Sequence, residues 1–320
     1  MTTKKAAFLF PGQGSQFVGM GRDFYDNSST ARHTFEEADD ALGFSLSTLC
    51  FEGPDERLRL TENTQPAIFT VSIAAQRVLA EKGIQPSYVA GHSLGEYSAN
   101  VAAGTLGFAD AVKTVRERGR FMQEAVPAGA GAMAAILNLA ADEVVKVCAE
   151  ASAETGGVVA AANINTPSQI AISGETAAVE RAMVLAKERG ARKVVHLAVS
   201  APFHCPLMQP AQDRLAVLLN ELTFHDATVP VLVNVDAALV IGADALRDAL
   251  IRQVTGTVRW VESMQLLIAE KPDYFLEVGP GKVLSGLLRH IDREQKLAHV
   301  QDGESLAAAL AMIEGDWEQR

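Results

Sequence analysis

The sequence predicts an α/β protein in which a small ferredoxin-like domain is inserted into a larger domain with a parallel sheet core. Two observations predict this. Near both ends of the chain, short apolar runs end in glycine-rich turns and alternate with helix-like stretches, as in α/β folds. In the middle, the segments follow the order strand, helix, strand, strand, helix, strand of a ferredoxin-like unit. We expect the large domain to comprise residues 1–128 and 199–320, and the small domain residues 129–198.

The elements of the first segment rest on periodicity and turn residues. The apolar run Ala6–Phe10 stops at PGQGSQ, as expected of a buried strand that enters a loop. Apolar residues recur at helical spacing over residues 66–82, and residues 88–90 form a brief strand-like run before a helix of small residues. Residues 108–126 have the pattern of an amphipathic helix, which ends at Pro127 before the linker-like AGAGA.

The remaining elements follow from the same signals. The small domain is expected to hold strands at 133–137, 158–163, 169–173 and 193–197, and helices at 141–153 and 177–189. Beyond it we expect helices at 208–222 and 243–252, a strand at 229–235 and a last strand at 274–278. Because the α/β pattern resumes after the insertion, the large domain should be discontinuous in sequence.

Composition and charge exclude several classes of protein. The chain has 320 residues, 48% of them hydrophobic, and its net charge of −11 argues against a general nucleic-acid binder. The first apolar run is too short for a signal peptide, and no stretch approaches the roughly 18 apolar residues of a membrane span. Cys50, Cys148 and Cys205 lie in no metal-ligand spacing. We therefore expect a cytoplasmic protein with reduced thiols, no bound metal and no membrane contact.

Ser93 lies at the centre of the sharpest motif, Gly91-His92-Ser93-Leu94-Gly95, between a strand-like run and a helix. In this G-x-S-x-G pattern a strained turn lifts the serine hydroxyl clear of the sheet, and the glycines let neighbouring backbone pack closely. The helix that begins at Leu94 aims its amide groups at charge that develops beside the serine. The motif in this setting predicts a nucleophile, whereas the pattern alone could be an incidental turn.

A serine nucleophile needs a base within hydrogen-bonding reach, and the chain has seven histidines. His204 lies in the irregular segment SAPFHCP downstream of Ser93, the chain order of hydrolase-type sites. His196 lies in an apolar strand and is expected to be a core histidine, and His92 is expected to have a structural role. The others are expected at the surface: His33, His225, His290 and His299. The residues alone leave open whether His204 is the base or an ordinary loop histidine.

The loop PGQGSQ offers a backbone donor rather than a nucleotide site. It begins a G-x-G-x-x-G pattern, but Phe17 occupies the third glycine position, so the dinucleotide fingerprint fails. Hydrolase-type oxyanion holes combine the amide after the nucleophile with an amide from the loop after an early strand. Leu94 and Gln13 are therefore the expected donors.

Three arginines crowd the segment RERGRFM. Arg116 and Arg120 share one helix face, and Arg118 points away from them. One interpretation is a solvated helix face, which is usual for such a run. The other is that Arg118 is buried and acts as a forked receptor for a carboxylate.

A series of ordered segments closely resembles the malonyl-CoA:acyl carrier protein transacylase family of bacterial fatty acid synthesis. The segments are FPGQGSQ (10–16), TQPAI (64–68), GHSLGEYSA (91–99), RGRFMQEAVP (118–127), NINTPSQIAISG (163–174), APFHCPLM (201–208), RQVTG (252–256) and EVGPGKVL (277–284). The similarity covers essentially the whole chain. It implies a hydrolase-like large domain that carries the serine and a ferredoxin-like small domain that closes the cleft.

The resemblance also implies catalytic roles. Ser93 becomes the nucleophile and His204 the base. The amides of Gln13 and Leu94 become the oxyanion hole. Gln253 matches the residue whose backbone carbonyl orients the histidine, in place of the acid of a full triad.

Further positions match substrate contacts of the family. Arg118 matches the residue that grips the malonyl carboxylate, and Asn163 is implied to lie near the substrate. Leu94 and Phe203 resemble the malonyl-selective forms of their motifs, in which an aromatic beside the histidine crowds an α-substituent. Discrimination against one extra carbon contributes about 1–3 kcal/mol, so the preference for malonyl over α-substituted acyl groups need not be strict.

The implied reaction moves a malonyl group from malonyl-CoA to the phosphopantetheine thiol of holo acyl carrier protein through a malonyl-serine ester. We expect ping-pong kinetics, a monomer and no cofactor beyond the coenzyme A thioester. The alternatives are an esterase or thioesterase, a polyketide-pathway malonyl transferase, and an inactive carrier-binding module. Carrier proteins of this pathway are acidic, so two basic clusters are candidate docking sites or ordinary surface charge: Lys187, Arg189, Arg192 and Lys193, and Lys282, Arg289 and Arg293.

Overall fold

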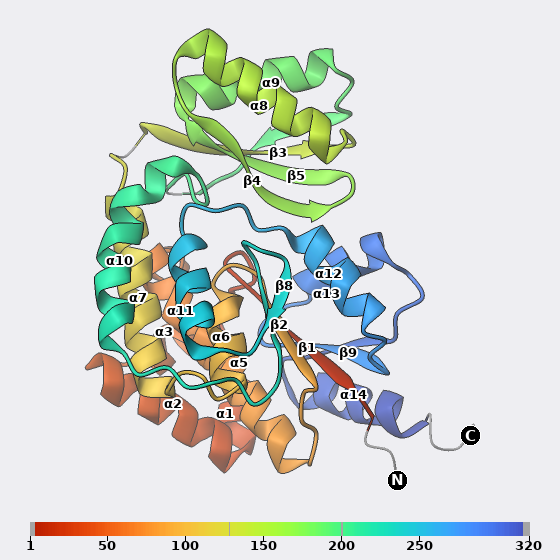
Figure 1. The fold of residues 1–320 in the computed structure, drawn as a ribbon. Helices are drawn as coiled ribbons and strands as arrows, with labels where there is room; N and C mark the ends of the chain where they lie inside the picture. Colours follow the sequence, from red (N-terminus) through yellow and green to blue (C-terminus); the bar gives the residue numbers. More distant parts are fainter. Residues whose placement is uncertain (1–3, 128, 200, 316–320) are drawn as a thin grey trace.

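A computed structural model of the protein describes residues 4–127, 129–199 and 201–315. The chain forms two sheets that lie in different parts of the molecule (Figure 1). Residues 128 and 200, which adjoin the expected domain boundaries, lie outside the described residues.

The first sheet has the strand order β10-β9-β1-β2-β7-β8. Its strands are β1 (Ala6–Phe10), β2 (Tyr88–Gly91), β7 (Val231–Val233), β8 (Ala238–Val240), β9 (Tyr274–Val278) and β10 (Leu297–Val300). All neighbours pair in parallel except β7 and β8, which are antiparallel. The expected parallel core is therefore present.

Strand β1 shows why these strands are continuous apolar runs. Phe8 and Phe10 pack into the core on one face of the sheet, whereas Ala7 and Leu9 pack into a separate core on the other face. Both faces are covered, as is usual for parallel strands.

Helices cover both faces of the first sheet (Figure 1). Those that carry buried residues of the larger core include α2 (Ser29–Leu42), α5 (Thr61–Glu81), α6 (Gly95–Ala102), α7 (Phe108–Glu124), α10 (Gln209–Glu221), α11 (Ala243–Arg252) and α14 (Gly303–Gly315). The opposite face is covered by α12 (Trp260–Ala269) and α13 (Val283–Ile291). Short helices complete the periphery: α1 (Arg22–Asn27), α3 (Leu46–Glu52), α4 (Asp55–Leu58) and the 3-10 turn Pro206–Met208.

The second sheet has the order β4-β5-β3-β6, with antiparallel neighbours throughout. Its strands are β3 (Gly131–Leu137), β4 (Val159–Thr166), β5 (Gln169–Glu175) and β6 (Lys193–His196). Helices α8 (Ala141–Thr155) and α9 (Thr176–Glu188) cover its outer face and share a hydrophobic core with it (Figure 1). The expected ferredoxin-like order of elements is present, and we call residues 131–196 the inserted unit.

Three expectations about strands were wrong. The strand expected at 229–235 is only β7, after which the chain reverses into β8 through a turn where Ala237 has a φ of 50°. The strand at 274–278 is not the last, because the half-buried β10 adds a further edge to the sheet. His196 is not a core residue, since β6 is an edge strand of the second sheet and its histidine is exposed.

The inserted unit is fastened to the rest of the chain by backbone pairing. Val258, in the loop between α11 and α12, forms an isolated parallel bridge with Asn163 of β4. The N–H of Ile164 donates to the Val258 carbonyl (2.9 Å), and the N–H of Val258 donates to the Ala162 carbonyl (2.8 Å). The side chain of Thr257 adds a hydrogen bond to the Ala161 carbonyl (2.7 Å). A movement of β4 would therefore displace the loop between α11 and α12.

Candidate active site

Ser93 lies on the tight turn between β2 and α6, with a φ of 51°. A left-handed conformation costs a non-glycine residue about 1–3 kcal/mol, so the surrounding structure has to hold it. Gly91 and Gly95 make this turn possible. A Cβ at Gly91 would lie 1.9 Å from the Gly95 carbonyl carbon, and a Cβ at Gly95 would lie 2.0 Å from the Phe10 carbonyl oxygen. The two glycines of the motif are thus required by close backbone packing.

The hydroxyl of Ser93 lies 2.7 Å from Nε2 of His204. Nδ1 of the same ring lies 2.9 Å from the main-chain carbonyl of Gln253, at the C-terminal end of α11. A carbonyl can only accept, so Nδ1 carries the ring proton and Nε2 is left to accept from the serine. His204 itself has a φ of 58°, and its side chain is buried. The structure thus aligns three residues that are far apart in sequence.

Burial, and next the nearby Arg118 guanidinium, lower the pKa of His204 to about 3. Both effects disfavour the imidazolium form. The imidazole is therefore neutral at physiological pH, as a proton acceptor has to be. His92, next to the serine, also has a lowered pKa because of burial, and its Nε2 is bonded to Oδ1 of Asn165 (2.8 Å).

Arg118 is buried, with 1% of its surface exposed, in contrast to its neighbours Arg116 and Arg120 on α7. Its Nη1 donates to Oε1 of Gln65 (2.8 Å). Its Nη2 donates to Oε1 of Gln253 (2.9 Å) and to Oγ of Ser93 (3.2 Å). All three acceptors are neutral side-chain groups, two amides and one hydroxyl. A buried guanidinium whose hydrogen bonds go to neutral groups is suited to bind an anionic substrate group beside the serine hydroxyl. Glu96 lies close enough to act on its charge.

The two amides expected to form an oxyanion hole belong to separate loops that meet at the site. Gln13 and Leu94 both line the cavity above Ser93. In the part of the chain that the structure describes, neither main-chain N–H donates a hydrogen bond to a backbone carbonyl or a side chain. Gly12 brings the loop close, because a Cβ there would lie 2.4 Å from the His92 carbonyl oxygen. The side chain of Gln13 points elsewhere and contacts Thr61 (3.4 Å).

A cavity of about 230 Å³ opens above these groups, between the first sheet and the inserted unit. Its lining includes the expected contacts Arg118, His204, Phe203 and Asn163. Residues of α13 form another part of the wall, namely Val283, Leu284 and Leu287. The cavity therefore presents a serine, an imidazole and a guanidinium to one small volume with apolar sides.

Four polar contacts at the site were not expected from the sequence. They come from Gln65, Glu96, Asn234 and the side chain of Gln253, all fully or almost fully buried. Gln65 and Glu96 stood within the segments TQPAI and GHSLGEYSA, where a polar residue in an apolar helix was the available signal. Asn234 follows β7, and nothing in its local sequence distinguishes it from a turn residue.

Within the described ranges, no cluster of His, Cys, Asp and Glu side chains is placed to hold a metal ion. The same residues include no helix that combines the length and apolar character needed to cross a bilayer. The three cysteines are buried and unpaired.

Comparison with known proteins identifies the family. Residues 7–314 match the acyl transferase domain model. The malonyl CoA-acyl carrier protein transacylase of Bacillus subtilis is 50% identical over 97% of this chain and 97% of its own length. The chain belongs to the malonyl-CoA:acyl carrier protein transacylase family.

Solved structures of this transacylase family agree in fold over nearly the whole chain. An acyl carrier protein S-malonyltransferase from Vibrio cholerae superposes with a TM-score of 0.93 at 46% identity, covering 95% of this chain and 99% of that one. A malonyl-transacylase solved with a type II polyketide synthase acyl carrier protein gives a TM-score of 0.93 at 45% identity, covering 96% and 99%. The sequence and structure comparisons thus agree on the mixed α/β fold and on membership of the transacylase family.

Proposed function

We propose that this protein is an acyl carrier protein S-malonyltransferase that moves malonyl groups from malonyl-CoA to acyl carrier protein in fatty acid synthesis. The position of the Ser93 hydroxyl is the main support for this reaction. The hydroxyl of Ser93 lies within hydrogen-bonding distance of a neutral imidazole (2.7 Å) and of a buried guanidinium (3.2 Å). The imidazole supports nucleophilic attack, and the guanidinium supports selection of an acyl group that bears a carboxylate.

In the first half-reaction, Ser93 Oγ attacks the thioester carbonyl of malonyl-CoA while Nε2 of His204 takes the hydroxyl proton. The carbonyl oxygen becomes an oxyanion that the amides of Gln13 and Leu94 stabilise. Collapse of this intermediate breaks the carbon–sulfur bond, and His204 returns its proton to the departing coenzyme A thiolate. A malonyl-serine ester remains. The Gln253 carbonyl keeps the imidazolium oriented and stabilises it by accepting a hydrogen bond from Nδ1–H.

In the second half-reaction, the phosphopantetheine thiol of the carrier protein enters in place of coenzyme A. His204 deprotonates the thiol, and the thiolate attacks the ester carbonyl. The carbon–oxygen bond to Ser93 breaks, and the serine recovers its proton from His204. Arg118 holds the malonyl carboxylate through both halves, so the acyl group stays in place while the thiols exchange.

A transfer assay separates this proposal from a hydrolase with the same serine and histidine. Malonyl-CoA labelled in the malonyl group is incubated with the enzyme, with and without holo acyl carrier protein. We expect label on the carrier protein and slow release of free malonate when carrier is absent. Rapid release of malonate with no label on the carrier would show that water is the acceptor and would overturn the proposal.

We further propose that residues 129–198 form a domain that closes over the serine carried by residues 1–128 and 199–320. Separate hydrophobic cores support this division. The cavity supports it as well, since Asn163, Asn165 and Gln169 of the inserted unit line the same space as Ser93. A monomeric state, a cytoplasmic location and the lack of a cofactor beyond the coenzyme A thioester stay predictions.

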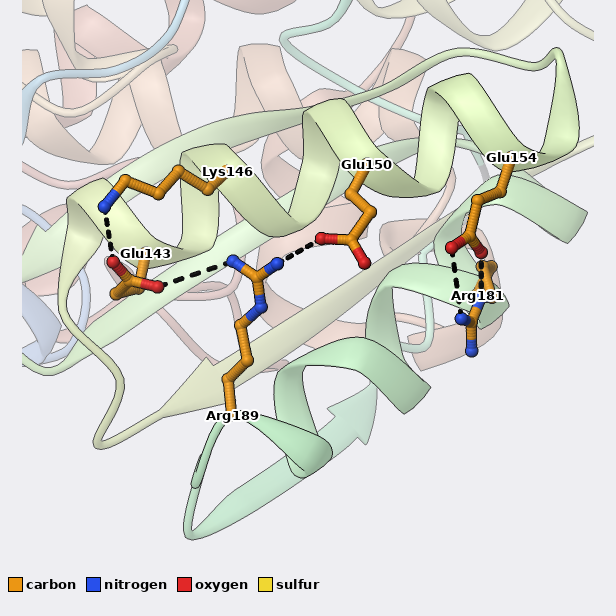
Figure 2. Close-up of polar contacts among 6 residues, drawn as sticks. All are labelled: Glu143, Lys146, Glu150, Glu154, Arg181 and Arg189. Carbon is orange, nitrogen blue, oxygen red and sulfur yellow. Dashed lines mark hydrogen bonds and ion pairs between the residues drawn. The ribbon is translucent and has the colours of Figure 1, made fainter.

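For the carrier protein we propose docking at the basic residues around α13. Lys282, Arg289 and Arg293 are exposed, and none forms an ion pair with another described residue. Lys282 directly precedes Val283 and Leu284, which line the cavity that the phosphopantetheine arm has to enter. Of the other cluster, Arg189 is already paired with Glu143 and Glu150 of α8 (Figure 2). These ion pairs largely neutralise the charge of Arg189, which makes it a weaker partner for an acidic carrier protein.

A further inference from the structure

Glu96 is a buried carboxylate that the reaction scheme leaves without a task. It lies in the first turn of α6, three residues after Ser93, and none of its surface is exposed. Burial raises its pKa to about 7. A fully buried carboxyl group has lost its hydration, and this costs free energy unless hydrogen bonds within the protein replace the lost water.

One oxygen of Glu96 receives two donors. Oε2 accepts from the main-chain N–H of Asn234 (2.9 Å) and from Nε2 of Gln253 (2.8 Å). The other oxygen, Oε1, has no hydrogen-bond partner among the described residues. Both hydrogen bonds to Glu96 therefore depend on a single oxygen, Oε2.

Three neighbours fix which way the amide of Gln253 faces, and Glu96 makes the shortest of these contacts. With Nε2 directed at Glu96 and at the Ser93 carbonyl (3.0 Å), Oε1 is left facing Nη2 of Arg118 (2.9 Å). If the amide were turned over, its oxygen would face the carboxyl oxygen and the Ser93 carbonyl. Its NH2 group would then face the guanidinium, donor against donor. Both contacts of the turned amide would be repulsive.

We infer that Glu96 is a positioning residue that fixes the side-chain amide of Gln253 and, through it, the direction of the Arg118 guanidinium. Nη2 of Arg118 is shared between Gln253 and Ser93, so the amide oxygen determines where this fork points. Glu96 bonds to the Gln253 amide, and that amide bonds to Arg118. A change at Glu96 should therefore affect recognition of the malonyl carboxylate rather than proton transfer. The inference rests on the proposed function, in which Arg118 holds that carboxylate.

Two conservative substitutions of Glu96 distinguish the effect of its acceptor oxygen from the effect of its negative charge. Glu96→Gln keeps an oxygen at the same reach, and the two N–H donors that converge on that position hold the amide oxygen there. Glu96→Asp keeps the charge but withdraws the acceptor by one methylene. The measurement is kcat/KM for malonyl-CoA and for acetyl-CoA with holo acyl carrier protein, together with the melting temperature of each variant.

We expect Glu96→Asp to lower the malonyl-to-acetyl ratio about tenfold, the loss expected when a charged hydrogen bond is misdirected. Glu96→Gln should keep the ratio within about twofold of wild type. The matched control is Glu277→Gln. Glu277 is also fully buried and also accepts two N–H groups, from Leu284 and Ser285, but it has no bond to Gln253 or Arg118. The control should lower the melting temperature and leave the ratio unchanged.

The outcomes distinguish this inference from the proposed function. If Arg118→Ala leaves the malonyl-to-acetyl ratio as in wild type, the assignment of Arg118 fails, whatever the Glu96 variants do. If Arg118→Ala removes the malonyl preference while Glu96→Asp keeps it, the positioning role of Glu96 is wrong. A ratio that falls in Glu96→Gln as far as in Glu96→Asp would also overturn it, because the charge rather than the acceptor would then be needed.

Discussion

Ser93 Oγ contacts two buried neighbours, His204 and Arg118, to which we assign different roles. Its proton is directed at Nε2 of His204, and its lone pair accepts from Nη2 of Arg118. The guanidinium also helps to lower the pKa of the imidazole. Catalytic groups with strongly shifted pKa values commonly arise from such a combination of burial and a nearby charge.

Substitution of Arg118 tests carboxylate recognition. In Arg118→Ala we expect kcat/KM for malonyl transfer to fall about ten- to a hundredfold, because a charged hydrogen bond contributes about 1.5–3 kcal/mol. Acetyl transfer should fall less. Arg120→Ala is the control, since Arg120 lies on the same helix but forms an exposed ion pair with Glu117. Equal losses on malonyl and acetyl substrates would contradict the proposed contact.

His204 should make stability depend on pH in a defined direction. Its folded-state pKa of about 3 lies below the ordinary value of 6.5. Below pH 6.5 the unfolded chain therefore binds a proton that the folded chain does not, and stability falls as the pH is lowered toward 3. Above pH 6.5 this residue has no effect.

Urea unfolding of the wild type and His204→Gln at pH 7.5 and pH 5.5 measures this effect. Comparison of the two proteins cancels other titrating groups, including Glu96, whose pKa is raised rather than lowered. Between the two pH values the wild type should lose about 1.4 kcal/mol more than the variant. Parallel pH dependences would show that the imidazole is not held neutral.

At the scale of single elements, the turn between β2 and α6 depends on two glycines that no larger residue can replace. Gly95→Ala would drive a methyl group against the Phe10 carbonyl, and we expect a loss of at least about 3 kcal/mol in unfolding free energy. Gly286→Ala is the opposite case. It lies within α13 with no atom near the added Cβ, so it should stabilise the protein by up to about 1 kcal/mol. Thermal melts of both variants check the contrast, and a tolerated Gly95→Ala would contradict the packing described.

The elements that the sequence predicted well are those with strong local signals. Strands β1 and β9 and helix α11 begin and end where periodicity and turn residues placed them. The signals failed for short edge strands. β8 and β10 are half-buried, with little alternation in their three or four residues, and they form only because a neighbouring strand offers free backbone groups.

The candidate site was predictable only in part for a similar reason. Ser93 carries its own local motif, and the arginine spacing indicated that Arg118 differs from its neighbours. His204 could not be separated from other histidines on local chemistry, because its alignment depends on Gln253, which is 49 positions away. Glu96 and Asn234 are joined across 138 positions by one hydrogen bond. Such contacts are properties of the packed chain.

At the scale of the whole molecule, the inserted unit and the loop that carries Gln253 are joined. Val258 pairs with β4 five residues after the carbonyl that orients His204. The cavity is lined from both sides of this junction. The position of the inserted unit and the alignment of the imidazole are therefore mechanically linked.

Charge reversal tests the docking surface. We expect the double variant Lys282→Glu, Arg289→Glu to raise the KM for holo acyl carrier protein severalfold and to leave the KM for malonyl-CoA unchanged, with the effect reduced at high salt. The comparison variant is Lys187→Glu, Lys193→Glu in the inserted unit. A KM that rises only in the comparison variant would place docking there instead.

The most direct test of the whole account is the mass of the protein after brief exposure to malonyl-CoA, with the modified residue located by peptide fragmentation. We predict a single malonyl adduct on Ser93 that disappears when holo acyl carrier protein is added, and no adduct in Ser93→Ala. An adduct on another residue, or an ester on Ser93 that the carrier thiol cannot remove, would contradict it.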